Sequence, residues 1–178
     1  MSDAAAKRAA RAIDALRRGW PVRVGELTLV AIETGAAADL FESDRIKGIL
    51  LSSARAATLK LANQFAAADT QLPVLIAPPS DLDASLALAI ADPSLDLRYP
   101  FKGPFVAQSL EQPEAALAAM ELAREAGLLP AFLIVEANAD AEFASTDLAA
   151  FQNADNLRIA ARARLPVSAA EDAELVAF

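Results

Sequence analysis

The sequence predicts a layered α/β domain, and three observations carry that prediction. Amphipathic helical segments alternate with short apolar runs along the 178 residues, as in domains whose helices cover a sheet. One stretch, residues 112–136, contains a helix, a helix stop and an apolar strand in direct succession. Hydrophobic residues make up 55% of the chain, which is enough for one core of ordinary size.

The stretch 112–136 has the clearest pattern. Pro113 suits the first helical position, because its missing N–H would lack a partner there, and Glu114 favours the positive end of the helix dipole. Gly127 can take the left-handed conformation that ends a helix. The apolar run 131–135 predicts a strand covered on both faces. Glu136 follows this strand at its carboxyl end, where open α/β sheets place ligands.

The remaining elements are predicted from periodicity and from capping and turn residues. Before residue 112 we expect a helix (5–18), two hairpin strands (21–24 and 27–32), a helix (37–46) stopped by Gly48, a strand (49–51), a helix (54–66) capped by Ser52 or Ser53, a strand (74–76), a helix capped by Ser80 or Asp81 that runs through Ile90, and a loop (94–109) with a brief strand around Val106. After residue 136 we expect an acidic loop (137–147), a helix (148–154) capped by Asp147, a strand (157–161) and a tail less tied to the core.

Composition limits the function. The formal net charge of −8 argues against nucleic acid or an anionic membrane as a partner. The sequence shows neither a signal peptide nor a membrane-spanning run, so we expect a cytoplasmic protein. There is no cysteine and no histidine, so any chemistry would rest on carboxylates, Lys, Ser/Thr or Tyr99.

Several polar and aromatic groups allow two interpretations. Arg98, Tyr99 and Lys102 could form a small anion pocket beside Gly103, or their loop could simply pack on its own aromatics. The 137–147 loop could collect a cation or be solvated. The arginines of the first helix are expected on its solvated face. Trp20 and Phe101 are expected to be core or dimer contacts.

Four segments resemble 3,4-dihydroxy-2-butanone 4-phosphate synthase, in the order that family has them. They are AIDALRRGWPVRV (12–24), DLDASLALAIADPS (81–94), PEAALAAMELAREAGLLPAFLIVE (113–136) and LAAFQNADNLRIA (148–160). Together they cover most of residues 10–161, and residues 54–72 have no counterpart. The resemblance implies a three-layer α/β sandwich for residues 1–161.

The same resemblance implies that the synthase reaction is lost. The family's metal-ligand His falls on Gln112, the Thr after it on Pro113, and its phosphate-binding Arg on Asp83. The family's acidic metal-binding loop is replaced by a turn at Gly25-Glu26. Glu114 and Glu136 remain as vestigial catalytic candidates, and no cofactor or metal is expected in this chain.

The tail, RARLPVSAAEDAELVAF (162–178), resembles the opening of GTP cyclohydrolase II through Arg164-Leu165-Pro166 and Val176-Ala177-Phe178. We therefore expect residues 162–178 to be a linker and the start of a cyclohydrolase domain, with zinc held only in the missing part of that domain.

Taken together, the two resemblances imply a catalytically degenerate N-terminal domain of a riboflavin-biosynthesis protein, structural and dimerising or else regulatory. The expected partners are a second copy of the chain, in a homodimer, and the attached cyclohydrolase domain. Two alternatives stay open. One is an active Mg²⁺-dependent lyase that uses Glu114 and Glu136 on ribulose 5-phosphate, and the other is a module that senses sugar phosphates or nucleotides.

Overall fold

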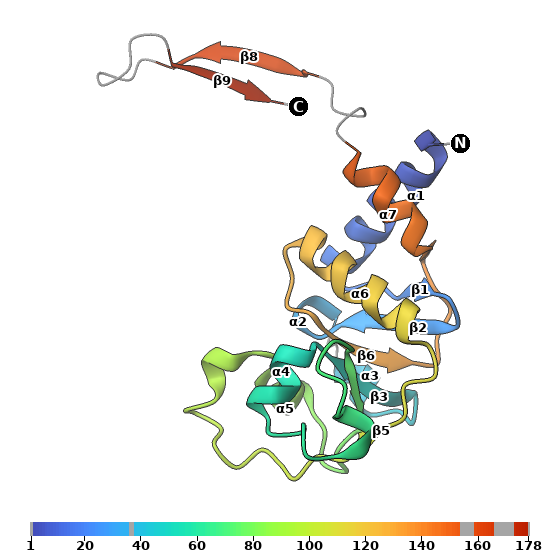
Figure 1. Cartoon of the computed structure of the whole chain (residues 1–178), viewed down its shortest axis with the longest axis vertical. Helices are drawn as coiled ribbons and strands as arrows, with labels where there is room; N and C mark the ends of the chain where they lie inside the picture. The colour runs from blue at the N-terminus through green and yellow to red at the C-terminus, as the bar shows by residue number, and fades with distance from the viewer. Residues whose placement is uncertain (1, 36–37, 154–158, 166–172, 178) are drawn as a thin grey trace.

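The computed structural model describes residues 2–35, 38–153, 159–165 and 173–177 (Figure 1). The described helices are α1 (Ser2–Arg17), α2 (Ile32–Gly35), α3 (Ala38–Phe41), α4 (Ser53–Thr58), α5 (Ala84–Ala91), α6 (Pro113–Ala126) and α7 (Ser145–Gln152), with 3-10 turns η1 (Phe65–Ala67) and η2 (Pro93–Leu95). The described strands are β1 (Val22–Val24), β2 (Leu27–Ala31), β3 (Ile46–Leu51), β4 (Val74–Ile76), β5 (Ala107–Gln108), β6 (Ala131–Val135), β7 (Ala141–Phe143), β8 (Ala161–Arg164) and β9 (Glu174–Ala177).

Seven strands form one sheet in the order β5-β4-β3-β6-β2-β1-β7. Strands β1 and β7 are parallel, and the other neighbours in this sheet are antiparallel. Helices α1, α6 and α7 cover one face, and α2, α4 and α5 cover the other (Figure 1). A separate hydrophobic cluster fills each side. The prediction of a layered α/β domain is therefore confirmed as a mixed α/β fold with a mostly antiparallel sheet.

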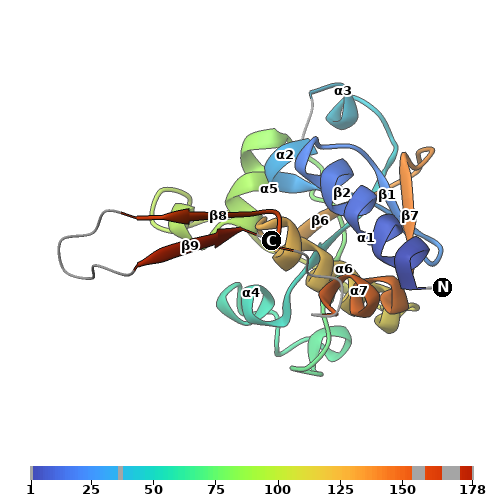
Figure 2. The ribbon, with the colours of Figure 1, turned by 90° about the horizontal axis from the view of Figure 1, so that it is seen from above.

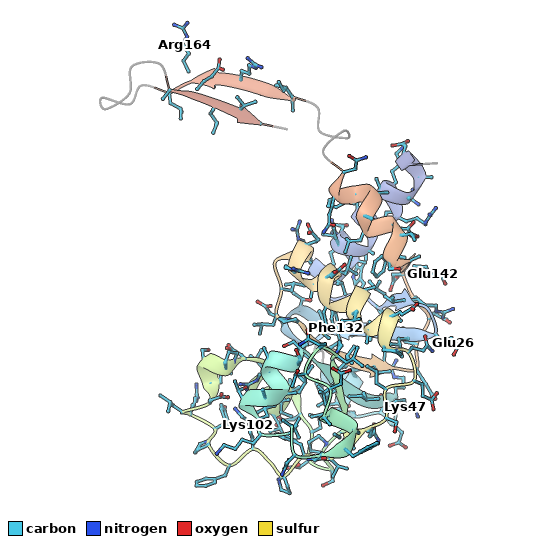
Figure 3. All side chains as sticks on the ribbon, in the orientation of Figure 1. Glu26, Lys47, Lys102, Phe132, Glu142 and Arg164 are labelled. Atoms are coloured by element: carbon cyan, nitrogen blue, oxygen red, sulfur yellow. The ribbon has the colours of Figure 1, made fainter. Side chains whose placement is uncertain are left out.

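The α6–β6 stretch has the predicted structure. Pro113 opens the helix, and Gly127, with φ of 70°, ends it. Phe132, which is labelled in Figure 3, and Leu133 of β6 are fully buried in opposite clusters, since successive strand residues face opposite sides of a sheet. The predicted hairpin is confirmed as well, because Val24 pairs with Leu27 across a two-residue turn.

The helix predicted at 37–46 is wrong in extent. Helix α3 ends at Phe41, and Ile46 already pairs with Val135 as the first residue of β3. Gly48 lies inside β3 and stops no helix. A Cβ at Gly48 would stand 2.6 Å from Leu75 Cδ1 of the neighbouring strand, so close strand packing explains this glycine.

The helix predicted at 54–66 is much shorter. Ser52 caps α4 as expected, by accepting a hydrogen bond from the Arg55 N–H at 3.2 Å. The chain leaves the helix after Thr58, because Lys60 takes a left-handed conformation with φ of 59°. The N–H groups of Lys60 and Leu61 donate back to the carbonyls of Ala57 and Ala56, both at 3.0 Å. This is a Schellman turn, which brings Leu61 into the core.

Two predicted helix caps are at other residues. Asp83, rather than Ser80 or Asp81, caps α5, and its Oδ1 accepts from the Leu86 N–H at 2.7 Å. Helix α7 begins at Ser145, so Asp147 lies inside its first turn instead of capping residues 148–154. The acidic loop also contains β7, which the sequence pattern did not indicate because an edge strand of three residues has too little periodicity to detect.

The tail forms its own two-stranded sheet. The strand predicted at 157–161 falls partly on residues 157 and 158, which lie outside the described residues, and the strand observed nearby begins at Ala161. Strand β8 pairs with β9 in antiparallel register, from Ala161 opposite Ala177 to Arg164 opposite Glu174. Figure 1 shows this hairpin apart from the seven-stranded sheet.

Candidate functional site

The N-terminus of α6 lies against the β1–β2 turn, and Gln112 joins the two. The Glu26 N–H donates to Gln112 Oε1 at 3.0 Å, and Gln112 Nε2 donates to Glu26 Oε2 at 3.0 Å. A backbone N–H can only donate and an ionised carboxylate can only accept, so both ends of the Gln112 amide are assigned by their partners. Both polar atoms of the Gln112 side chain, just before α6, are therefore bound to the β1–β2 turn.

Gly25 makes this contact possible. Its φ is +60°, and a Cβ at this position would stand 2.7 Å from Gln112 Oε1. Glycine is thus required twice, for the left-handed backbone and for the close approach of the amide.

A cavity of about 490 Å³ lies beside this contact. Its walls come from the β1–β2 turn and from the first turns of α6 and α7, with Val24, Gly25, Glu111, Gln112, Pro113, Glu114, Ala115, Ala118, Ala144 and Ser145 as lining residues. Glu114 occupies the first helical turn, as predicted, where a carboxylate is stabilised by the helix dipole. The charged groups of this lining are the carboxylates of Glu111 and Glu114.

Glu136 lies in different surroundings. Its carboxylate forms an ion pair with Lys47 of β3 at 3.3 Å, and both side chains are exposed. Its N–H donates to the Arg45 carbonyl at 2.9 Å. The expectation that Glu136 stands at a common carboxyl edge of the sheet is wrong, because β6 runs antiparallel to both of its neighbours, β2 and β3.

The two candidate glutamates do not share a cavity, since Glu114 lines the α6 cavity and Glu136 does not. Across the described residues, His, Cys, Asp and Glu side chains form no group of three or more that could hold a metal ion.

An ion pair that the sequence did not indicate joins α1 to α7, which lie side by side in Figures 1 and 2. Arg8 donates to both carboxylate oxygens of Asp147, and the Ala144 N–H donates to the same group at 2.9 Å. The hydrogen bond from Arg8 holds the pKa of Asp147 below its ordinary value. Arg8 is therefore not merely solvated, and Asp147 is engaged inside the protein. No local pattern could have indicated a pair 139 residues apart.

Trp20 and Phe101, expected as core or dimer contacts, both lie at the surface of the single chain. Phe101 is 95% exposed and is not a core residue. Trp20 is about half exposed, with the Arg18 guanidinium 5.2 Å from its ring centroid. Arg98 lies 5.6 Å from the Tyr99 ring centroid. Lys102 has a side chain only 7% exposed. The residues of the predicted anion pocket are brought together, since Arg98, Tyr99, Lys102 and Gly103 all line one cavity of about 530 Å³.

None of the helices that the structure describes is long and apolar enough to cross a membrane. Comparison of the chain with protein-family models, with curated proteins and with solved structures finds no match.

Proposed function

We propose that this chain is a non-catalytic N-terminal domain of a GTP cyclohydrolase II-type protein, with a three-layer α/β sandwich of butanone-phosphate synthase type in residues 1–161. Its role in the proposal is structural: it dimerises and supports the cyclohydrolase domain that residues 162–178 begin. The proposal rests on the sequence resemblance and is supported by what the structure does with the residues at the family's catalytic positions.

The observation that carries the proposal is the Gln112–Glu26 contact. In the resemblance, Gln112 stands where the synthase family has a metal-ligand His. Here both polar atoms of the Gln112 side chain are used to fix the β1–β2 turn to α6. The β1–β2 turn stands where the family has its acidic loop. A position that binds metal in the family is used for mechanical support in this chain.

Asp83 supports the same conclusion. The resemblance places the family's phosphate-binding Arg at this residue, which reverses the charge. The Asp83 carboxylate caps α5 through the Leu86 N–H, a contact that an Arg side chain could not make. Two positions that the resemblance aligns with the family's site thus have local structural roles.

The hairpin β8–β9 supports a separate unit at the C-terminal end of the described chain. Its register places Ala161 and Ala163 opposite Ala177 and Leu175 on one face, so that face is apolar. All four residues are exposed, and a lone two-stranded hairpin is marginally stable in water. Such a face is expected to be covered by the remainder of a second domain.

A formate-release assay tests the loss of the lyase. The purified chain is incubated with ribulose 5-phosphate and Mg²⁺, and we expect no formate above the protein-free rate. Formate release that disappears in Glu114→Gln would instead establish the alternative, an active lyase. The parent protein should release formate from GTP, and Glu114→Gln in the parent should leave that rate unchanged.

Light scattering after size exclusion tests the dimerising role. We expect a measured mass twice that of one chain. At the same concentrations, a variant that lacks residues 159–178 should also have twice the mass of its own chain. A monomer at all concentrations would refute the dimerising role without bearing on the loss of the lyase.

A further inference from the structure

A buried charge cluster on the side of the sheet opposite α6 consists of one carboxylate, Asp96, and two cations, Arg55 and Lys102. Arg55 Nη2 and Nη1 donate to the two oxygens of Asp96 at 2.7 and 2.8 Å, and Lys102 Nζ also donates to Asp96. The Arg55 and Lys102 side chains are 5% and 7% exposed. One carboxylate for two cations leaves an uncompensated positive charge inside the protein. This arrangement is costly unless a further anion or water compensates it.

Arg55 is saturated by structural contacts. Besides Asp96, it donates to the carbonyls of Ile90 at 2.6 Å and Ala89 at 3.0 Å, at the C-terminal end of α5. These bonds tie α4 to the negative end of the α5 dipole. Arg55 contributes charge to the cluster but has little donor capacity left.

Lys102 is not saturated. Its ammonium donates to the Ala89 carbonyl at 2.9 Å and to Asp96, and an ammonium group has three N–H donors. The third donor has no partner among the described protein groups. Lys102 also lines a cavity.

Lys60 lines the same cavity. It occupies the left-handed position of the Schellman turn that ends α4, where glycine is the favoured residue. Among the residues that the structure describes, no carboxylate forms an ion pair with the Lys60 ammonium. The exposed Lys60 ammonium therefore has no counter-charge among these residues, and residues held in the left-handed region concentrate at functional sites.

The cavity has a volume of about 350 Å³ and lies between the end of α4 and the loop after η2. Its walls are Thr58, Leu59, Lys60, Asp96, Tyr99, Pro100, Lys102, Gly103, Pro104 and Phe105. Figure 3 shows Lys102 close to α4 and well separated from Glu26, so this cavity is distinct from the α6 site. With Arg55 directly behind Asp96, three cations and one carboxylate surround it, which leaves two positive charges.

We propose that this cavity binds a small phosphorylated metabolite, with Lys60 and Lys102 as the groups that hold the phosphate. A phosphate monoester carries about 1.5 to 2 negative charges at neutral pH, which matches the two excess positive charges; a carboxylate would leave one uncompensated. Lysine is a common phosphate ligand. The volume lies in the range of small-molecule sites, roughly 300–1,000 Å³, and leaves room for an organic group beside the phosphate. This inference is independent of the proposed structural role.

Thermal unfolding and calorimetry of the whole chain test the site with three probes at matched ionic strength: inorganic phosphate, ribose 5-phosphate and ribose. A ligand that binds only the folded state raises Tm. We expect both phosphates to raise Tm, ribose 5-phosphate more than inorganic phosphate, and ribose to have no effect. If inorganic phosphate alone binds, the ligand is the free anion, which overturns the assignment of a metabolite. No shift with either phosphate overturns the site itself.

The deciding variant is Lys60→Gly, because it removes the cation and relieves the left-handed backbone at once, so it cannot lose binding through misfolding. We expect its Kd for ribose 5-phosphate to rise about tenfold, the loss of one charge-assisted hydrogen bond. Lys7→Gln removes the same charge from an exposed ion pair on α1 and should keep the wild-type Kd. An unchanged Kd in Lys60→Gly would overturn the role of Lys60 as a phosphate ligand, and an equal rise of Kd in Lys7→Gln would show that phosphate responds only to net charge.

Discussion

Arg8 of α1 and Asp147 of α7 form a two-point ion pair across 139 residues of sequence, with donor–acceptor distances of 3.0 and 2.5 Å. The Asp147 side chain is 2% exposed and that of Arg8 about half exposed, so the pair has a buried acceptor and a solvated donor. It fixes the position of the first helix on the last helix of the main domain.

We expect Asp147→Ala to lower the free energy of unfolding by about 1–3 kcal/mol, because it removes the acceptor for Arg8 and for the Ala144 N–H. Urea denaturation measures the change. Asp140→Ala, in the exposed loop before β7, is the control and should stay close to wild type. Equal stability of the two variants would show that the α1–α7 pair is energetically neutral.

Asp96 should be the more costly carboxylate to remove. Asp96→Asn leaves Arg55 and Lys102 buried without a counter-charge, and we expect a loss of about 2–4 kcal/mol, moderated because Asp96 itself is 38% exposed. The matched control is Asp81→Asn, an exposed carboxylate on the loop before α5. If Asp96→Asn lowers the free energy of unfolding by less than Asp81→Asn does, solvent already screens the charges of Arg55 and Lys102.

The pH dependence of stability should follow these two carboxylates. Hydrogen bonds, from Arg55 to Asp96 and from Arg8 to Asp147, hold both pKa values below the ordinary Asp value of about 3.9. In acid the unfolded chain therefore binds more protons than the folded chain. The stabilisation that the two ionised carboxylates provide is complete when the pH lies above the ordinary Asp pKa. It is lost as the pH falls through the folded-state pKa values. Urea titrations should show the gap between wild type and Asp147→Asn closing below about pH 4, and a constant gap would contradict the assignment.

The left-handed residues that end α4 and α6, Lys60 and Gly127, predict opposite effects of exchange. Lys60→Gly should stabilise the chain by about 1 kcal/mol, since a side chain in the left-handed region costs roughly 1–2 kcal/mol. Gly127→Ala should destabilise it by a similar amount; a Cβ there meets no atom within 4 Å, so the cost comes from φ alone. Thermal unfolding checks both, and Lys60→Ala, which keeps the strained backbone, should gain nothing.

The Gln112–Glu26 contact can be measured by a double-mutant cycle. Gln112→Ala and Glu26→Ala should each cost about 0.5–1.5 kcal/mol, and the double variant should cost less than their sum because the residues act as a unit. Gly25→Ala should cost more than either, because it strains the turn and displaces the Gln112 amide. Additive losses would show that the amide does not hold the turn.

The amino-acid sequence by itself determined the elements whose signals are local. The α6–β6 stretch was predictable because Pro113, the apolar period, Gly127 and the run 131–135 act within a few residues of one another. The β1–β2 hairpin followed from two apolar runs on either side of a glycine turn. Glu114 was placed in its first helical turn for the same reason.

Only the tertiary structure decided which charges meet. The partners that Arg55 contacts outside α4 lie 34 to 41 residues away, and the partner of Arg8 lies 139 away. Sequence periodicity carries no information at such separations. The antiparallel direction of β2 and β3 beside β6 likewise depends on sheet assembly. Glu136 follows β6 as expected, but the neighbouring strands do not end at the same edge. The short α4 and the cavity beyond it depend on Lys60 in a conformation that its side chain disfavours, which the packing of Leu61 against the core stabilises.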